Sequence, residues 1–157
     1  MLTWVDLLAL FSLALGLALG FRAGVVMGFV GAGLVLYVLL AQLGLSGWGV
    51  ALALGLGAGL LGKSLPLTRL SRGLEAALGT LGGFLLGLFL ALSLWTGYPW
   101  ERTGAGTLRY PAATLPTPIY QGVAQSPFAR EAFRLAWSTP WLRKALALEG
   151  QHPGKGK

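Results

Sequence analysis

Charged side chains are nearly absent from the first 95 residues of this 157-residue chain. The ones present are Asp6, Arg22, Lys63, Arg69, Arg72 and Glu75. Long stretches rich in Leu, Gly and Ala run between them, and a soluble fold of this size cannot bury so much apolar surface. A bilayer can, because its core accepts about 20 apolar residues per helix and requires each segment to satisfy its own backbone hydrogen bonds. The sequence therefore predicts an all-α membrane protein.

Residues 1–96 are expected to form a transmembrane bundle of about four helices. The expected spans are residues 4–20, 24–41, 45–62 and 75–96. The continuous apolar run of the third span, about 15 residues, reaches only about 22 Å as a helix, against a hydrocarbon core of about 30 Å. This segment either crosses fully or forms a re-entrant hairpin packed inside the bundle. A full crossing is favoured, because Lys63 then reaches an interface.

The first span is expected to be retained rather than cleaved as a signal peptide. A signal peptide begins with a positively charged region, whereas the charge that precedes this apolar run is Asp6. A second apolar stretch also follows almost at once.

The composition changes after residue 96, where a C-terminal tail begins. Trp95, Tyr98 and Trp100 are expected to form an aromatic belt where the chain leaves the membrane. Residues 97–125 are predicted to be an irregular Gly/Pro/Thr-rich connection, and residues 150–157 a disordered end.

Between them, residues 126–149 are predicted to form short amphipathic helices. Ser126-Pro127 and Thr139-Pro140 each place a hydroxyl cap before a proline in the first helical turn. Such basic, aromatic helices usually lie in the headgroup plane, and the alternative is that they pack on each other as a small cap.

Twenty-five glycines are far more than stable soluble helices tolerate. In lipid, glycines spaced by four residues let helices approach closely, either within one chain or between copies. One such ladder comprises Gly79, Gly83 and Gly87, and another comprises Gly16, Gly20, Gly24 and Gly28. The first is the stronger candidate for a contact face and for self-association, although a compositional bias toward Gly and Ala would also produce such spacings.

The chain offers little chemistry, and we expect no enzyme, cofactor or metal site. His152 is the single histidine, there is no cysteine, and the few acidic residues are dispersed. Residues 57–64 match the spacing of a phosphate-binding loop, but they fall in an apolar segment rather than between a strand and a helix. The net charge of +7 comes from basic residues that flank apolar segments or lie in the tail, a pattern typical of membrane-surface contact rather than nucleic-acid binding.

The N-terminal part of the chain resembles the colicin V production protein family, which comprises small bacterial inner-membrane proteins with about four spans. The resemblance rests on Val5-Asp6 at the start of the first span, the Gly-x-Arg-x-Gly turn at 20–24, the glycines of 28–33 and the basic entry to the fourth span at 72–79. It implies a non-catalytic scaffold or accessory protein for toxin export, secretion or envelope maintenance. The alternative from another class is an oligomeric small transporter or channel subunit.

Positive charge in short loops orients membrane helices. Four spans would place Arg22 and the basic stretch 63–72 together in the cytoplasm, so both termini are predicted outside it. Arg22 and Glu75 are then expected to approach each other; alternatively, Arg72 holds Glu75, or Arg22 extends to lipid phosphate. The expected partners are the lipid bilayer and other membrane proteins, including further copies of the chain.

Overall fold

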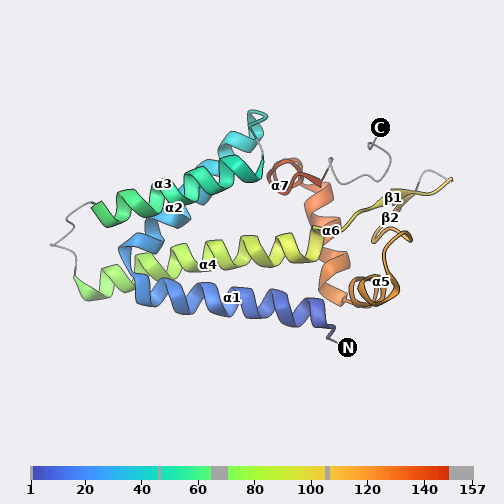
Figure 1. Cartoon of the computed structure of the whole chain (residues 1–157), viewed down its shortest axis with the longest axis horizontal. Coiled ribbons are helices and arrows are strands. Elements are labelled where there is room, and N and C mark those ends of the chain that lie inside the picture. The colour runs from blue at the N-terminus through green and yellow to red at the C-terminus, as the bar shows by residue number, and fades with distance from the viewer. Residues whose placement is uncertain (1, 46, 65–70, 105–106, 149–157) are drawn as a thin grey trace. The chain divides into compact units, whose positions relative to one another are not determined.

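The computed structural model describes residues 2–45, 47–64, 71–104 and 107–148, most of which are helical (Figure 1). In chain order the elements are α1 (Trp4–Ala23), α2 (Val25–Gln42), α3 (Trp48–Ser64), α4 (Arg72–Thr96), β1 (Glu101–Arg102), β2 (Leu108–Arg109), α5 (Thr117–Ala124), α6 (Pro127–Ser138) and α7 (Pro140–Ala145). The chain divides into two compact units. We call Phe11–Leu90 the bundle unit, and Met1–Leu10 with Ala91–Lys157 the tail unit.

Helices α1, α2 and α4 are long and apolar enough to cross a membrane, as the sequence predicts. Helix α3 is apolar but has only 17 residues. At 1.5 Å per residue its length is about 25 Å, which is shorter than a hydrocarbon core of about 30 Å. The described helices therefore include three candidate spans and one shorter apolar helix.

The first two helices meet at a single residue. A turn is expected over residues 20–24, but only Gly24 lies between α1 and α2. Helix α1 continues three residues beyond the predicted end of the first span. Nothing in Phe21-Arg22-Ala23 interrupts a helix, whereas Gly24 adopts φ 55° and ψ −134°, a conformation that favours glycine. Its amide donates to the Gly20 carbonyl at 3.0 Å, which closes the last turn of α1.

The third and fourth helices also begin at positions other than those predicted. Gly44 and Gly47 both have positive φ, so helical geometry resumes only at Trp48 rather than at residue 45. Helix α4 begins at Arg72 rather than at residue 75. Ser71 precedes it and caps it, because its hydroxyl accepts a hydrogen bond of 3.4 Å from the Leu74 amide.

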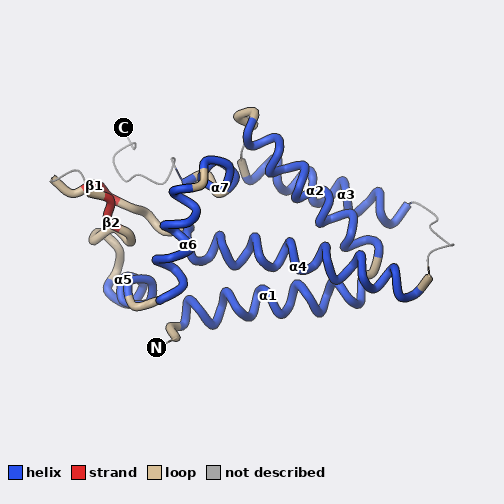
Figure 2. The backbone as a smooth tube through the Cα atoms, turned by 180° about the vertical axis from the view of Figure 1, so that it is seen from behind, coloured by secondary structure: helices blue, strands red, loops and turns tan. Residues whose placement is uncertain are grey.

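Within the bundle unit, α1 and α4 pack backbone against backbone through glycines (Figures 1 and 2). A Cβ atom on Gly83 would clash with the Gly16 carbonyl oxygen and lie 2.7 Å from the Gly20 Cα. A Cβ on Gly79 would lie 2.7 Å from the Gly24 Cα. The two ladders run in opposite chain directions, so α1 and α4 are antiparallel. The predicted contact face is confirmed.

The ladder of α4 has its partner within the same chain. Since α1 already covers Gly79, Gly83 and Gly87 within the chain, contact between copies through these glycines stays a prediction. Helix α2 packs on α4 in the same manner, since a Cβ on Gly31 would lie 2.5 Å from the Gly82 Cα. The glycine spacing thus serves the internal packing of the bundle unit.

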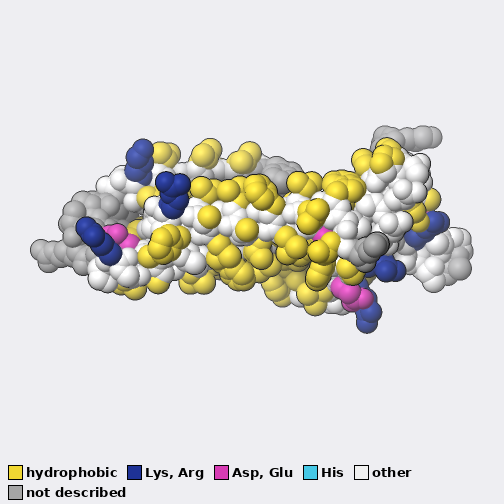
Figure 3. Space-filling model, turned by 90° about the horizontal axis from the view of Figure 1, so that it is seen from below, with side chains coloured by type: hydrophobic (Ala, Val, Ile, Leu, Met, Phe, Trp, Pro, Cys, Tyr) yellow, Lys and Arg dark blue, Asp and Glu magenta, His cyan; other side chains and the backbone are white. Residues whose placement is uncertain are grey.

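Helix α3 packs on α2 through small residues as well. A Cβ on Gly33 would lie 2.9 Å from the Ala58 Cβ, and one on Gly62 would lie 3.1 Å from the Val26 Cα. Large side chains point outward instead, and Leu60 of α3 is 69% exposed. Figure 3 shows one face of the molecule, on which hydrophobic side chains cover the helical surface. Small residues inside and leucines outside suit a hydrocarbon surrounding.

Residues 97–125 hold more regular structure than predicted. Strands β1 and β2 pair antiparallel, with Glu101 opposite Arg109 and Arg102 opposite Leu108. Helix α5 follows, with Pro116 before it and Pro118 in its first turn. Proline fits the first helical turn, where its missing N–H has no intrahelical partner to lose. The prolines of this segment therefore begin a helix rather than prevent one.

Helices α6 and α7 confirm the predicted short helices within 126–149, and each has its proline in the first turn. The hydroxyl of Ser126 caps α6 as predicted, whereas the predicted cap at Thr139 is wrong, because its side chain makes no cap hydrogen bond. Aromatic side chains of α6 pack against residues of the preceding segment, 97–125. The Phe133 ring stacks on Tyr110 with centroids 4.0 Å apart, and Trp137 meets Trp100 at 4.7 Å. The predicted disordered end, 150–157, lies outside the described residues.

We predict that Gly83→Ala destabilises the bundle by about 1–3 kcal/mol, because a methyl group meets the backbone of α1, which cannot move aside as a side chain can. Gly55→Ala in α3 is the matched control, since nothing lies within 4 Å of a Cβ there. Denaturant titration in detergent measures both variants. Equal stability of the two would contradict this packing, and light scattering checks that oligomer mass is unchanged.

Candidate functional site

The side chain with the most developed polar environment is Asp6, at the start of α1. The helix begins at Trp4, so Thr3 is the N-cap and Asp6 is the third helical residue. Both the amide and the hydroxyl of Thr3 donate to Asp6 Oδ2, at 2.9 and 3.1 Å. The bond from the Thr3 amide is one half of a capping box, in which the acidic side chain satisfies a backbone donor that the helix leaves free.

The second oxygen of Asp6 binds residues that are distant in sequence. Trp95 Nε1, near the end of α4, donates to Oδ1 at 3.1 Å, and the Ser126 hydroxyl donates to the same oxygen at 2.5 Å. Asp6 is fully buried in the tail unit. A carboxylate has about four acceptor positions, and these donors occupy all of them. The buried charge is therefore compensated by hydrogen bonds.

Ser126 connects this carboxylate to α6. Its Oγ accepts a hydrogen bond of 2.8 Å from the Ala129 amide, which caps the N-terminus of α6. The same hydroxyl donates its hydrogen bond to Asp6 Oδ1. Asp6 thereby joins the start of α1, the end of α4 and the start of α6. We call Thr3, Asp6, Trp95 and Ser126 the carboxylate cluster.

Aromatic side chains enclose the carboxylate cluster. Trp95 stacks on Phe128 at 5.6 Å, and the Tyr110 hydroxyl donates to the Trp95 carbonyl. Burial raises the pKa of both Tyr98 and Tyr110 above the ordinary value. Trp100 is buried, and its indole N–H donates to the Leu148 carbonyl at 2.8 Å. Trp95 and Trp100 of the predicted aromatic belt thus take part in the internal packing of the tail unit.

The carboxylate cluster is better suited to structure than to catalysis. A serine beside an aspartate occurs in hydrolases, but there a histidine between them accepts the proton. Here Ser126 bonds Asp6 directly and also caps a helix, so its lone pairs are not aimed at a substrate. Among the residues that the structure describes, no three of His, Cys, Asp and Glu come together as metal ligands. Residues 57–64 belong to α3 and form no phosphate loop.

The other predicted site residues lie in the bundle unit. Gly20, Gly24, Gly79, Gly83 and Gly87 form the contact between α1 and α4 described above.

Arg22 and Glu75 also belong to the bundle unit. A Cβ atom on Gly24, the residue after α1, would lie 3.8 Å from the Glu75 Cβ, so the end of α1 is close to the start of α4. Within the described ranges, neither Arg22 nor Arg72 forms an ion pair with Glu75. The predicted proximity of the two helix ends is correct, but the predicted pairing is not formed.

Sequence analysis singled out Asp6 and the Ser126 cap separately and missed their contact. The pattern Thr3-x-x-Asp6 is a local capping signal that could have been recognised. No local signal links either residue to the other, 120 positions apart.

A scan against protein-family models gives no match, and searches of curated proteins and of solved structures also give none. The resemblance to the colicin V production proteins therefore rests on the sequence motifs alone. The carboxylate cluster and the glycine contacts are the observations from which function has to be argued.

We predict that Ser126→Ala destabilises the tail unit by about 1–3 kcal/mol, because it removes a donor from a buried carboxylate and the cap of α6 together. Ser138→Ala is the control, since that exposed hydroxyl bonds only the Leu135 carbonyl of its own helix. Limited proteolysis in detergent, with cleavage mapped over residues 97–148, distinguishes them. Identical protection of the two variants would show that the carboxylate cluster does not hold the tail unit together.

A second prediction concerns alkaline pH. Tyrosine in an unfolded chain ionises near pH 10, and burial favours the neutral form of Tyr98 and Tyr110 in the folded tail unit. Their raised pKa contributes stability that is fully present below pH 10 and is lost as pH rises above it. Absorbance at 295 nm, recorded with circular dichroism, should show part of the tyrosine ionising only as structure is lost. Complete ionisation near pH 10 with the fold intact would contradict this burial.

Proposed function

We propose that this chain is a non-catalytic scaffold of the bacterial inner membrane that presents its folded tail unit, called the cap from here on, at one membrane face. The observation that carries the proposal is the carboxylate cluster, in which one buried charge ties the start of α1 and the end of α4 to the start of α6. Such an arrangement gives a rigid platform rather than a reactive group. A role in export or envelope maintenance, as in the colicin V production proteins, agrees with a platform of this kind.

The antiparallel pairing of α1 and α4 supports an even number of membrane crossings. Trp95, near the end of α4, bonds Asp6 at the start of α1, so these two ends lie on the same side of the membrane. Helices α2 and α3 together must then add either two crossings or none. Helix α2 has the length and hydropathy of a span, which favours two crossings and hence four in all. A short α3 can cross if it tilts little and the bilayer thins locally.

The distribution of basic residues supports an orientation. In the sequence, Arg22, Lys63, Arg69 and Arg72 flank the ends of spans that the four-span arrangement places together on one side of the membrane. Positive charges in short loops favour the cytoplasmic side. The cap and both termini would then lie outside the cytoplasm.

The cap carries large apolar side chains that remain exposed. Phe128, Leu135 and Trp141 are each at least 45% exposed, although they belong to helices whose other faces are buried. We infer that these side chains contact other proteins, because a partner can cover apolar surface that the folded tail unit leaves exposed. They support membrane-embedded or exported proteins as partners of the scaffold.

Two measurements test the proposal. A periplasm-active reporter fused after Lys157 should be active, and the same reporter inserted at residues 65–70 should be inactive; the reverse pattern would overturn the orientation. A photo-crosslinking residue at Leu135 should capture proteins in native membranes, whereas one at Leu56, which is 67% exposed on α3, should capture mainly lipid. Equal protein capture at the two positions, or capture unaffected by Ser126→Ala, would contradict a scaffold function of the cap.

A further inference from the structure

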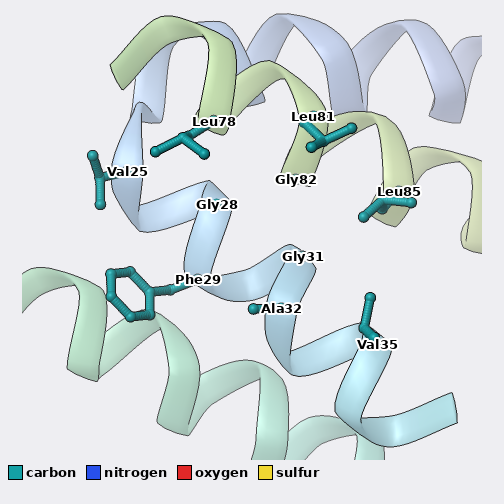
Figure 4. A pocket seen from close by; sticks show the side chains of 10 residues that line it. All are labelled: Val25, Gly28, Phe29, Gly31, Ala32, Val35, Leu78, Leu81, Gly82 and Leu85. Carbon is teal, nitrogen blue, oxygen red and sulfur yellow. The ribbon is translucent and has the colours of Figure 1, made fainter. Parts of the chain in front are cut away.

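An apolar groove of about 330 Å³ opens on the surface of the bundle unit between α2 and α4 (Figure 4). Val25, Phe29 and Val35 line it from α2, and Leu78, Leu81 and Leu85 line it from α4. Figure 4 shows these two sets of side chains on either side of the opening. Every lining residue is apolar, so the groove suits a hydrocarbon chain and no polar ligand.

The glycines of the groove are already used by the contact between its own helices. A Cβ on Gly82 would lie 2.9 Å from the Gly28 Cα, and a Cβ on Gly31 would lie 2.5 Å from the Gly82 Cα. Apart from Ala32, the groove therefore presents branched and aromatic side chains outward. Close association with a further helix in lipid relies on small residues at the surface. The groove is consequently better suited to a flexible chain than to the helix of a second copy.

One end of the groove lies beside a group of cations. Arg22 is in the last turn of α1, just before Gly24 and Val25. Lys63 follows Gly62, which packs on Val26 and Phe29 of α2. Arg72 opens α4, whose Glu75 meets Gly24. These three basic side chains are all exposed and belong to the same end of the bundle unit.

The length of the groove also fits one leaflet. From Val25 to Val35 the helix rises about 15 Å, at 1.5 Å per residue. This is about half of a hydrocarbon core of roughly 30 Å. A hydrocarbon chain that enters the groove at the cationic end would therefore reach the middle of the bilayer at the far end of the groove.

From this geometry we propose that the groove binds an acyl chain of an anionic phospholipid, whose phosphate lies among Arg22, Lys63 and Arg72. The walls supply apolar contact along one leaflet, and the cations supply attraction for a negatively charged headgroup. This inference does not depend on the function of the cap. It concerns the bundle unit alone.

The test uses the full-length protein in nanodiscs that contain either phosphatidylglycerol or phosphatidylcholine with a photoreactive group in the acyl chain. Mass spectrometry of peptides then locates the adducts. Adducts within residues 25–35 and 78–85 should be several-fold more abundant with phosphatidylglycerol. Replacing Arg22, Lys63 and Arg72 with glutamine should lower them by a factor on the order of fivefold per cation.

Matched variants separate the groove from general lipid contact. Ala32→Trp fills the groove, whereas Ala77→Trp adds the same side chain at an exposed position of α4 on a different surface. Only Ala32→Trp should reduce the adducts. Glutamine at Arg102, Arg130 and Arg134 of the tail unit controls for the loss of charge and should leave them unchanged.

Equal labelling by the two lipids, or equal loss with Ala32→Trp and Ala77→Trp, would overturn the proposal. Crosslinks from residues 25–35 to a second copy of the chain in place of lipid would overturn it as well. If Ala32→Trp fails to fold, two comparisons still test the proposal. One compares labelling by the two lipids, and the other compares the two variants in which three basic residues are replaced with glutamine.

Discussion

The closeness of α1 and α4 is the constraint on which the rest of the structure depends. Gly16 and Gly20 meet Gly79 and Gly83 with no room for a Cβ atom between the backbones. Contacts of this kind fix the register of two helices, because a shift of α1 by one residue would place larger side chains, such as Leu15 and Leu19, where its glycines now meet α4. They also make the helices antiparallel. The start of α1 and the end of α4 are therefore neighbours, and a tail that follows α4 can fold around Asp6.

A buried carboxylate at the beginning of a membrane helix is stable here for identifiable reasons. The free amides and the positive end of the helix dipole favour negative charge in the first turn of α1. Thr3, Trp95 and Ser126 then supply the hydrogen bonds that water would otherwise provide. An apolar residue at position 6 would leave the donors of Trp95 and Ser126 without this acceptor. The acid is thus a specific link between segments rather than a tolerated charge.

Local patterns in the sequence predicted the local structure well. The length of the apolar stretches predicted the long helices, and the glycine spacing predicted the contact face of α4. The Ser-Pro and Thr-Pro pairs predicted the starts of α6 and α7. The pattern could not identify which helix the glycines of α4 contact, because the same spacing serves one chain or two. It also could not join Asp6 to Ser126, since hydrogen bonds between distant residues leave no periodic signal. The missed helix α5 shows that prolines mark helix starts as well as loops.

The two units are stabilised by different interactions, which suit different surroundings. In the bundle unit, close backbone contacts with leucines turned outward are favourable where the surroundings are apolar, because burying leucine gains little in lipid. In the tail unit, a saturated carboxylate and stacked rings such as Tyr110 and Phe133 exclude water from polar groups. Helices α1 and α4 contribute residues to both units. Asp6 and Trp95, which hold the tail unit together, therefore belong to the same two helices whose glycines pack in the bundle unit.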